Sequence, residues 1–233
     1  MAYIVAMLIL CLAYGICLAL MKHMQNTRRW NFVFMALVYL QYLWLVLYVY
    51  QDVGVADWNF QNTLPMANVS PFMFSLMPLL LILPKKIKEQ FHTLIALLTV
   101  GMLLSATLGC ISNAVIRYKF HPHFLLDYGA HFVLSAFGVY LVKSGQVKLT
   151  WKNCLSGGVW LYGAAGCMLV LNVVLDQAFF GLSLNGRHNI YNRVLVENSY
   201  LSALIYFVGL GVVMVLGAVF CKILNRKTSC PAA

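Results

Sequence analysis

The sequence predicts an all-α protein, a polytopic bundle of seven transmembrane helices. Three observations predict it. Hydrophobic residues make up 62% of the chain and charged residues only 9%, whereas a soluble domain carries about 25% charged residues. The apolar residues form uncharged runs of about 20 residues, the length that a helix needs to cross a bilayer. The connectors between the runs are short, so we expect one transmembrane domain over residues 1–233 and no soluble domain.

Seven apolar runs follow one another, and each is expected to be a helix. Their approximate limits are Ala2–Met21, Asn31–Tyr50, Leu64–Leu83, Phe91–Asn113, Phe124–Val142, Asn153–Leu175 and Ser199–Cys221. The first run has neither a basic stretch before it nor a small-residue cleavage site, which favours a retained helix over a signal peptide. The third run contains Pro65, Pro71 and Pro78, and proline inside a helix kinks or breaks it. We therefore expect its first half to be interrupted and to line a polar cavity.

The basic residues sort to alternate connectors. One side holds 12 of the 16: Lys22, Arg28, Arg29, Lys85, Lys86, Lys88, Lys143, Lys148, Lys152, Lys222, Arg226 and Lys227. The other side holds four basic residues (Arg117, Lys119, Arg187 and Arg193) and five of the six acidic ones (Asp52, Asp57, Asp127, Asp176 and Glu197). Short loops rich in Lys and Arg stay in the cytoplasm, so the N-terminus is predicted outside and the C-terminus inside.

The net charge of +10 does not indicate nucleic-acid binding. The basic residues are already distributed among cytoplasmic loops, where anionic lipid attracts them. The seven cysteines form no disulfide framework, and no pair has the spacing of a metal site. We expect no metal, no other cofactor and no nucleic acid. The expected partner is membrane lipid, with another membrane protein as the alternative.

The start of the fifth run carries the strongest polar cluster. His121 and His123 lie just before the run, and His123, Asp127 and His131 recur every four residues, which places them on one helical face. A carboxylate one turn from a histidine orients the ring and stabilises the imidazolium, as a general base requires. We predict His131 and Asp127 as candidate catalytic residues, and His121 and His123 as binding residues.

A second polar group lies at the end of the sixth run. Asn172 and Asp176 are one turn apart, and the connector after them is rich in Gly, Asn and aromatic residues and contains Arg187, His188 and Asn189. A long connector of this kind indicates a lid or re-entrant segment rather than a plain link. We predict these five residues as binding residues.

His131 lies about two turns inside its apolar run, where a polar side chain is costly unless it is paired. We therefore predict a partner for it within the bundle. Asn172, Asp176 and Asp127 are the candidates.

The run Leu-Pro-Met-Ala-Asn-Val-Ser-Pro-Phe from Leu64 to Phe72 resembles the signature of YwaF-like bacterial membrane proteins, which typically reads Leu-His-Leu-Cys-Asn-Ile-Ser. The stretch with Tyr128, His131 and Tyr140, and the Gly-Asn-aromatic connector after Asn172, are similar in order and spacing. Animal relatives of the family are seven-helix lipid acyltransferases, so the resemblance implies acyl chemistry on membrane lipids that uses a Cys and a His.

The chain departs from this family at the decisive positions. Ala67 stands where the family has its Cys, and Pro65 where it has its first His. An alanine has no nucleophilic atom. Asn68 and Ser70 do match the family signature, and we predict both as binding residues.

We therefore favour a YwaF-like protein whose outward-facing polar cavity, between the third, fifth and sixth helices, binds lipid or a membrane partner as a non-catalytic or altered-activity member. One alternative is a membrane lipid acyltransferase or hydrolase with His131 as general base. The other is a small-solute transporter, because interrupted helices also mark transporter sites. The resemblance implies a bacterial plasma membrane.

Overall fold

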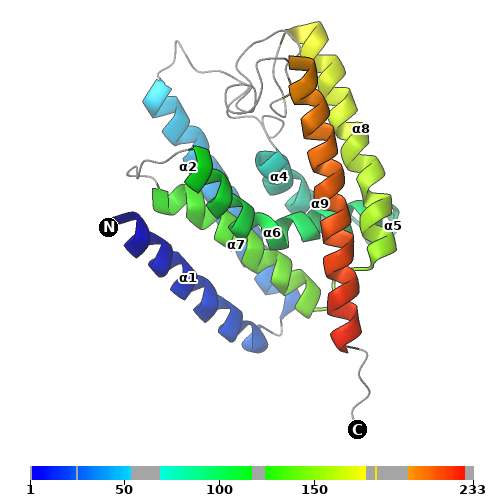
Figure 1. Ribbon diagram of the computed structural model, residues 1–233. Coiled ribbons are helices and arrows are strands. Elements are labelled where there is room, and N and C mark those ends of the chain that lie inside the picture. The colour runs from blue at the N-terminus through cyan, green and yellow to red at the C-terminus, as the bar shows by residue number, and fades with distance from the viewer. Residues whose placement is uncertain are drawn as a thin grey trace.

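The computed structural model describes residues 2–24, 26–53, 69–116, 124–176, 182 and 199–228, and all regular structure in these residues is helical. The elements are α1 (Ala2–Leu20), the 3-10 turn η1 (Met21–His23), α2 (Thr27–Val53), α4 (Val69–Ile82), α5 (Lys85–Gln90), α6 (His92–Ile116), α7 (Phe124–Lys143), α8 (Trp151–Leu175) and α9 (Ser199–Thr228) (Figure 1). The all-α prediction is confirmed in the described residues, and each of the seven apolar runs overlaps one helix. The seven membrane spans and their orientation stay predictions.

Two helices extend beyond their apolar runs into polar sequence. α2 begins at Thr27 rather than Asn31, because Asn26 caps it: the Asn26 side-chain oxygen accepts a hydrogen bond from the Arg29 N–H at 3.0 Å. α9 continues to Thr228, past the end of its apolar run. Hydrophobicity alone does not report such polar helical turns.

The short helix α5 was not predicted, because its sequence, KKIKEQ, is polar. It follows Pro84, which ends α4. Lys88 of α5 reaches back, and its Nζ donates a hydrogen bond to the Leu81 carbonyl at 2.9 Å. A C-terminal carbonyl of α4 thereby gains a partner that the helix cannot supply.

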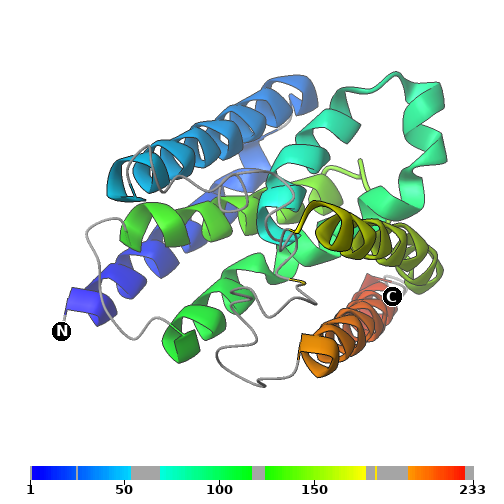
Figure 2. The ribbon, with the colours of Figure 1, turned by 90° about the horizontal axis from the view of Figure 1, so that it is seen from above.

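Helix α6 lies at the centre of the bundle. It packs against α4, α7, α8 and α9, while α7 also packs against α1 and α2, and α8 against α9. Figure 2 shows α1, α2 and α7 on one side of α6 and α8 and α9 on the other. The large hydrophobic core lies among α2, α4, α6 and α7, with the Phe34 and Phe137 rings stacked at a centroid distance of 5.2 Å.

Glycines allow the helices to approach closely. A Cβ on Gly157 of α8 would overlap the Thr93 carbonyl oxygen of α6 and lie 2.7 Å from the Leu97 Cβ. Gly163, further along α8, has nothing within 4 Å of the corresponding position. The contact between α6 and α8 therefore depends on the missing side chain at Gly157.

The described part of the third apolar run is helical despite its prolines. Pro71 lies in the first turn of α4, where a missing N–H costs nothing, and Pro78 lies inside the helix. Near Pro78, the Ser75 carbonyl accepts a hydrogen bond from the Tyr39 hydroxyl of α2 at 3.2 Å. A neighbouring helix thus supplies a donor beside the proline. The predicted interruption in the first half of the run is therefore wrong from Val69 onward, and residues 64–68 lie outside the described residues.

The outer surface of the bundle is largely apolar. Large hydrophobic side chains are exposed along α1, α2, α8 and α9; examples are Leu12, Leu40, Val170 and Val212. Within the described residues, one helix, Trp151–Leu175, is long and apolar enough to span a membrane, and Met7–His23, His92–Thr107, Gly129–Lys143 and Ala203–Val219 are shorter apolar stretches. A soluble monomer rarely leaves this much contiguous apolar surface uncovered.

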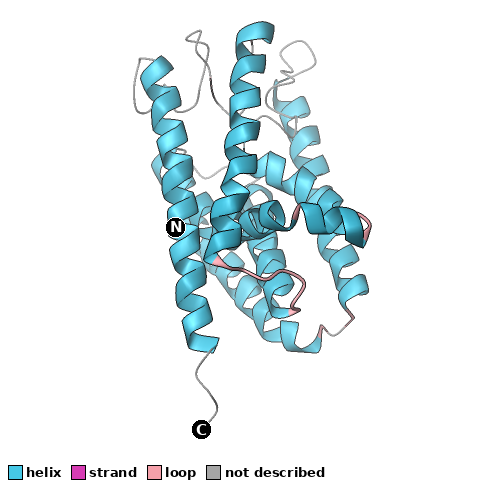
Figure 3. Cartoon of the chain, turned by 90° about the vertical axis from the view of Figure 1, so that its right-hand side faces the viewer, coloured by secondary structure: helices cyan, strands magenta, loops and turns pink. Residues whose placement is uncertain are grey.

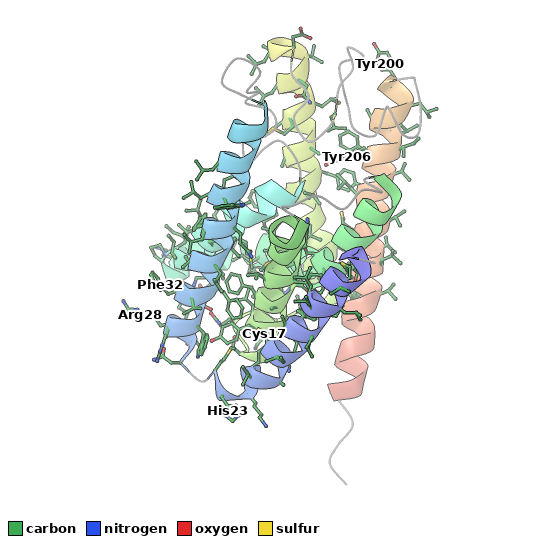
Figure 4. All side chains as sticks on the ribbon, turned by 90° about the vertical axis from the view of Figure 1, so that its left-hand side faces the viewer. Cys17, His23, Arg28, Phe32, Tyr200 and Tyr206 are labelled. Atoms are coloured by element: carbon green, nitrogen blue, oxygen red, sulfur yellow. The ribbon has the colours of Figure 1, made fainter. Side chains whose placement is uncertain are left out.

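The connectors that carry basic residues lie toward one end of the bundle. The loops before α2, on both sides of α5 and between α7 and α8, pink in Figure 3, lie in its lower half, where α9 also ends. In Figure 4, His23 and Arg28 lie at the lower end of α1 and α2, whereas Tyr200 lies at the opposite end of the bundle. Several basic residues that the sequence assigns to one side thus lie toward the same end of the bundle.

Candidate functional site

His131 of α7 has a polar partner inside the bundle, as predicted. Its Nδ1 lies 2.9 Å from the Ser105 Oγ of α6, and Ser105 is only 4% exposed. Ser105 was not among the predicted partners, because a single serine in an apolar helix gives no pattern in the sequence. Only the packing of α6 against α7 brings the two residues together.

One turn further along α7, Ser135 continues the polar contacts. The Ser135 hydroxyl donates to the Leu103 carbonyl at 3.0 Å, and the Tyr14 hydroxyl of α1 lies 3.0 Å from the same Ser135 oxygen. A hydroxyl has one proton to donate, so Tyr14 is the donor to Ser135. His131 and Ser135 therefore present adjacent polar groups along α7 to α1 and α6.

Gln41 of α2 approaches α7 on another face. Its side-chain nitrogen lies 3.8 Å from the position of a Cβ on Gly129, and residues two apart, such as Gly129 and His131, lie on opposite faces of a helix. Its carbonyl oxygen Oε1 is buried and has no hydrogen-bond partner among the described residues. A buried acceptor without a donor costs about 1–3 kcal/mol.

Five polar residues from four helices thus contact α7, and we call them the α7 seam: Tyr14, Gln41, Ser105, His131 and Ser135, with Gln41 on the face opposite His131. Counted from Phe124, His131 lies roughly 10 Å along α7, at 1.5 Å per residue. Only His131 of this group was predicted. The other four are isolated polar residues in apolar helices, and isolation in such a setting is the one sequence signal that could have found them.

Asn172 of α8 lies in a different contact. It is buried, and its amide nitrogen donates to the Leu182 carbonyl in the connector between α8 and α9. Leu182 is fully buried and packs in one cluster with Ala165, Met168 and Ala203. At Leu182 the connector therefore packs against α8 and α9. The rest of the predicted lid or re-entrant segment lies outside the described residues.

Asp176 ends α8. It adopts the left-handed conformation (φ 52°, ψ 47°), and its N–H donates to the Asn172 carbonyl. A non-glycine residue in this conformation is uncommon, and aspartate tolerates it better than most. Asn172 and Asp176 are thus one turn apart, as predicted.

The proposed cavity between the third, fifth and sixth helices is not what the described residues show. α7 packs against α6, α1 and α2, whereas α8 packs against α6 and α9. His131 contacts Ser105 of α6, and Asn172 contacts Leu182 in the connector after α8. Helix packing thus associates His131 with the first, second and fourth apolar runs.

The remaining predicted residues are less fully described. Asp127 and Ser70 lie within α7 and α4, where the backbone is helical. Asn68, His121, His123, Arg187, His188 and Asn189 lie outside the described residues. Among the side chains described, no group of three or more His, Cys, Asp or Glu residues could hold a metal ion.

The fold and the seam together define an all-helical bundle with an apolar outer surface and a polar group enclosed within it. No family model matches the chain, and no curated protein or solved structure matches it. The resemblance to YwaF-like proteins stays a prediction.

Proposed function

We propose that this chain is a multi-pass plasma-membrane protein of the YwaF-like group, with seven spanning helices, the N-terminus outside and the C-terminus in the cytoplasm. The apolar side chains exposed on α1, α2, α8 and α9 support the membrane location, because a bilayer covers such a surface at no cost. The basic connectors at one end of the bundle support the orientation.

Within this bundle, the α7 seam binds the head group of a membrane lipid. The observation that carries this function is the buried Gln41 oxygen, an acceptor that no described residue serves. A ligand group with an O–H or N–H donor would satisfy it. The ligand is therefore a lipid whose head group donates hydrogen bonds.

Replacing Gln41 by leucine separates binding from folding. The substitution removes the unpartnered oxygen, so we expect thermal stability in detergent to be unchanged or higher, while the lipid that co-purifies with the full-length protein falls by about tenfold, the loss of one well-made hydrogen bond. Mass spectrometry of lipid extracts from the purified protein provides the measurement.

Gln146→Leu is the matched control for this experiment. Gln146 pairs with Asn31 at the other end of the bundle, through contacts of 2.6 and 3.0 Å. The same chemical change there should leave the retained lipid unaltered. If wild-type and Gln41→Leu proteins retain the same lipids in the same amounts, the seam is not a lipid site.

A second function, acyl transfer or hydrolysis of membrane lipids, is favoured by the contact of 2.9 Å between Ser105 and His131. In this chemistry the Ser105 Oγ attacks the ester carbonyl and His131 Nδ1 takes the hydroxyl proton. The intermediate then releases the lipid alcohol and leaves an acyl-serine, which a second alcohol or water cleaves. Ser105 thereby takes the nucleophilic role that Ala67 cannot fill.

A fluorophosphonate probe, which reacts covalently with activated serines, tests this chemistry. We expect wild type and Ser135→Ala to be labelled, whereas Ser105→Ala and His131→Gln should not be. An unlabelled wild type would leave the seam as a binding site without a nucleophile.

A further inference from the structure

A second candidate site lies at the basic end of the bundle, away from the seam. A hollow of about 440 Å³ is lined by Met21, Lys22, Met24, Thr27, Tyr140, Lys143 and Ser144, which come from η1, the start of α2 and the end of α7. We call it the basic hollow. Its volume lies within the range of sites that bind small ligands, about 300–1,000 Å³.

The charge around the basic hollow is positive. Lys22 and Lys143 line it, and the exposed side chains of His23, Arg28 and Arg29 follow Lys22 closely in the chain. The sequence contains no acidic residue in 1–51 or in 128–175, the segments from which the hollow is built. Nothing in these segments neutralises the two lysines.

The backbone at the hollow also favours an anion. Thr27 is the first residue of α2, and the N-terminus of a helix carries a partial positive charge and N–H groups without intrahelical acceptors. The last carbonyls of α7 are already occupied: Tyr140 and Val142 accept from the N–H groups of Ser144 and Gly145. Lys22 and Lys143 are therefore not needed to cap α7.

Tyr140 lines the hollow but is nearly fully buried. It is 2% exposed, and its hydroxyl has no accessible surface, so a ligand in the hollow would not reach that hydroxyl. The polar side chains that line the hollow and are at least partly exposed are Lys22, Thr27, Lys143 and Ser144. Phosphate oxygens match lysine ammonium groups and helix N-termini.

We propose that the basic hollow binds a phosphate group, held by Lys22, Lys143 and the N-terminus of α2. The apolar wall formed by Met21 and Met24 favours the phosphate of an anionic phospholipid over a soluble phosphate. That preference rests on the proposed membrane location, which would place the hollow at the inner leaflet, where anionic lipids gather. Phosphate recognition itself does not depend on that location.

Binding to full-length protein in a neutral detergent tests the proposal. The probes are dioctanoyl phosphatidic acid, dioctanoyl phosphatidylcholine and inorganic phosphate, followed by native mass spectrometry and by the ligand-induced rise in melting temperature. We expect phosphatidic acid to bind in preference to phosphatidylcholine, whose choline group offsets the phosphate charge. The double variant Lys22→Gln, Lys143→Gln should weaken this binding by about tenfold or more.

The control removes two charges from the same side of the protein but outside the hollow. Lys85→Gln with Lys86→Gln changes exposed residues of α5 and should bind phosphatidic acid as wild type does.

The two sources of phosphate give different competition results. Displacement of phosphatidic acid by millimolar inorganic phosphate supports a site for soluble phosphate, and a lack of displacement supports a site for lipid. If wild type binds no phosphatidic acid, binds phosphatidylcholine equally well, or is matched by the Lys22→Gln, Lys143→Gln variant, the proposal is overturned. Such a result would not affect the proposed lipid site at the α7 seam, because Gln41→Leu tests that site separately.

Discussion

Leu12→Lys is expected to remove most of the folded protein from the membrane fraction. Leu12 lies near the middle of α1 and is 67% exposed. At an exposed position of a soluble protein such a change stays within about 0.5 kcal/mol. At the centre of a spanning helix, lysine costs about 2.5–3.5 kcal/mol, a large part of a total stability of about 5–15 kcal/mol.

Leu20→Lys is the matched control, because it introduces the same residue at another exposed position of the same helix. Leu20 is 52% exposed and ends α1 beside the basic turn η1, so a lysine there can extend its ammonium group into the interface. Membrane-fraction yield and size-exclusion profiles of tagged protein compare the two variants. Equal yields of correctly folded Leu12→Lys and Leu20→Lys would argue against a lipid-covered α1.

Gly157→Ala is expected to lower the melting temperature of the protein. The new Cβ would overlap the Thr93 carbonyl oxygen, which belongs to the backbone of α6 and cannot rotate away as a side chain can. The two helices must separate, and overpacking of this kind costs about 1–3 kcal/mol or more. Since α6 is the central helix, its contacts with α7 are expected to loosen as well.

Gly163→Ala provides the comparison on the same helix. The space around its Cβ is open, and alanine is favoured over glycine in a helix by about 1 kcal/mol. The melting temperature in detergent should therefore fall for Gly157→Ala and hold or rise for Gly163→Ala. A Gly157→Ala protein that melts at the wild-type temperature would show that α6 and α8 do not pack this closely.

Helix positions were predictable from the sequence because apolar runs and polar connectors alternate so regularly. The start of α2 at Thr27 and the end of α9 at Thr228 could not be predicted in this way, because the turns at these helix ends are polar. The Asn26 cap, rather than hydrophobicity, begins α2. α5 was missed for the same reason. Its contribution, the Lys88 hydrogen bond to the Leu81 carbonyl, depends on the path of the chain around Pro84.

The candidate site was predictable in part. An intramembrane histidine is conspicuous in the sequence, so His131 was found, and the need for a partner followed from the cost of an unpaired polar group. Ser105 and Gln41 were not found, because which residues meet is decided by the rotation and register of α6 and α2 against α7. Apolar on all sides, these helices carry no amphipathic stripe from which that rotation could be predicted.

The central claim is a seven-span membrane topology with the N-terminus outside, and single-cysteine labelling tests it most directly. In intact cells, on a background without the native cysteines, a thiol reagent that cannot cross the membrane should modify Asp57→Cys and Asn185→Cys. It should not reach Lys86→Cys or Lys148→Cys until the membrane is permeabilised. Labelling of the two lysine positions in intact cells, with Asp57→Cys and Asn185→Cys protected, would contradict the topology.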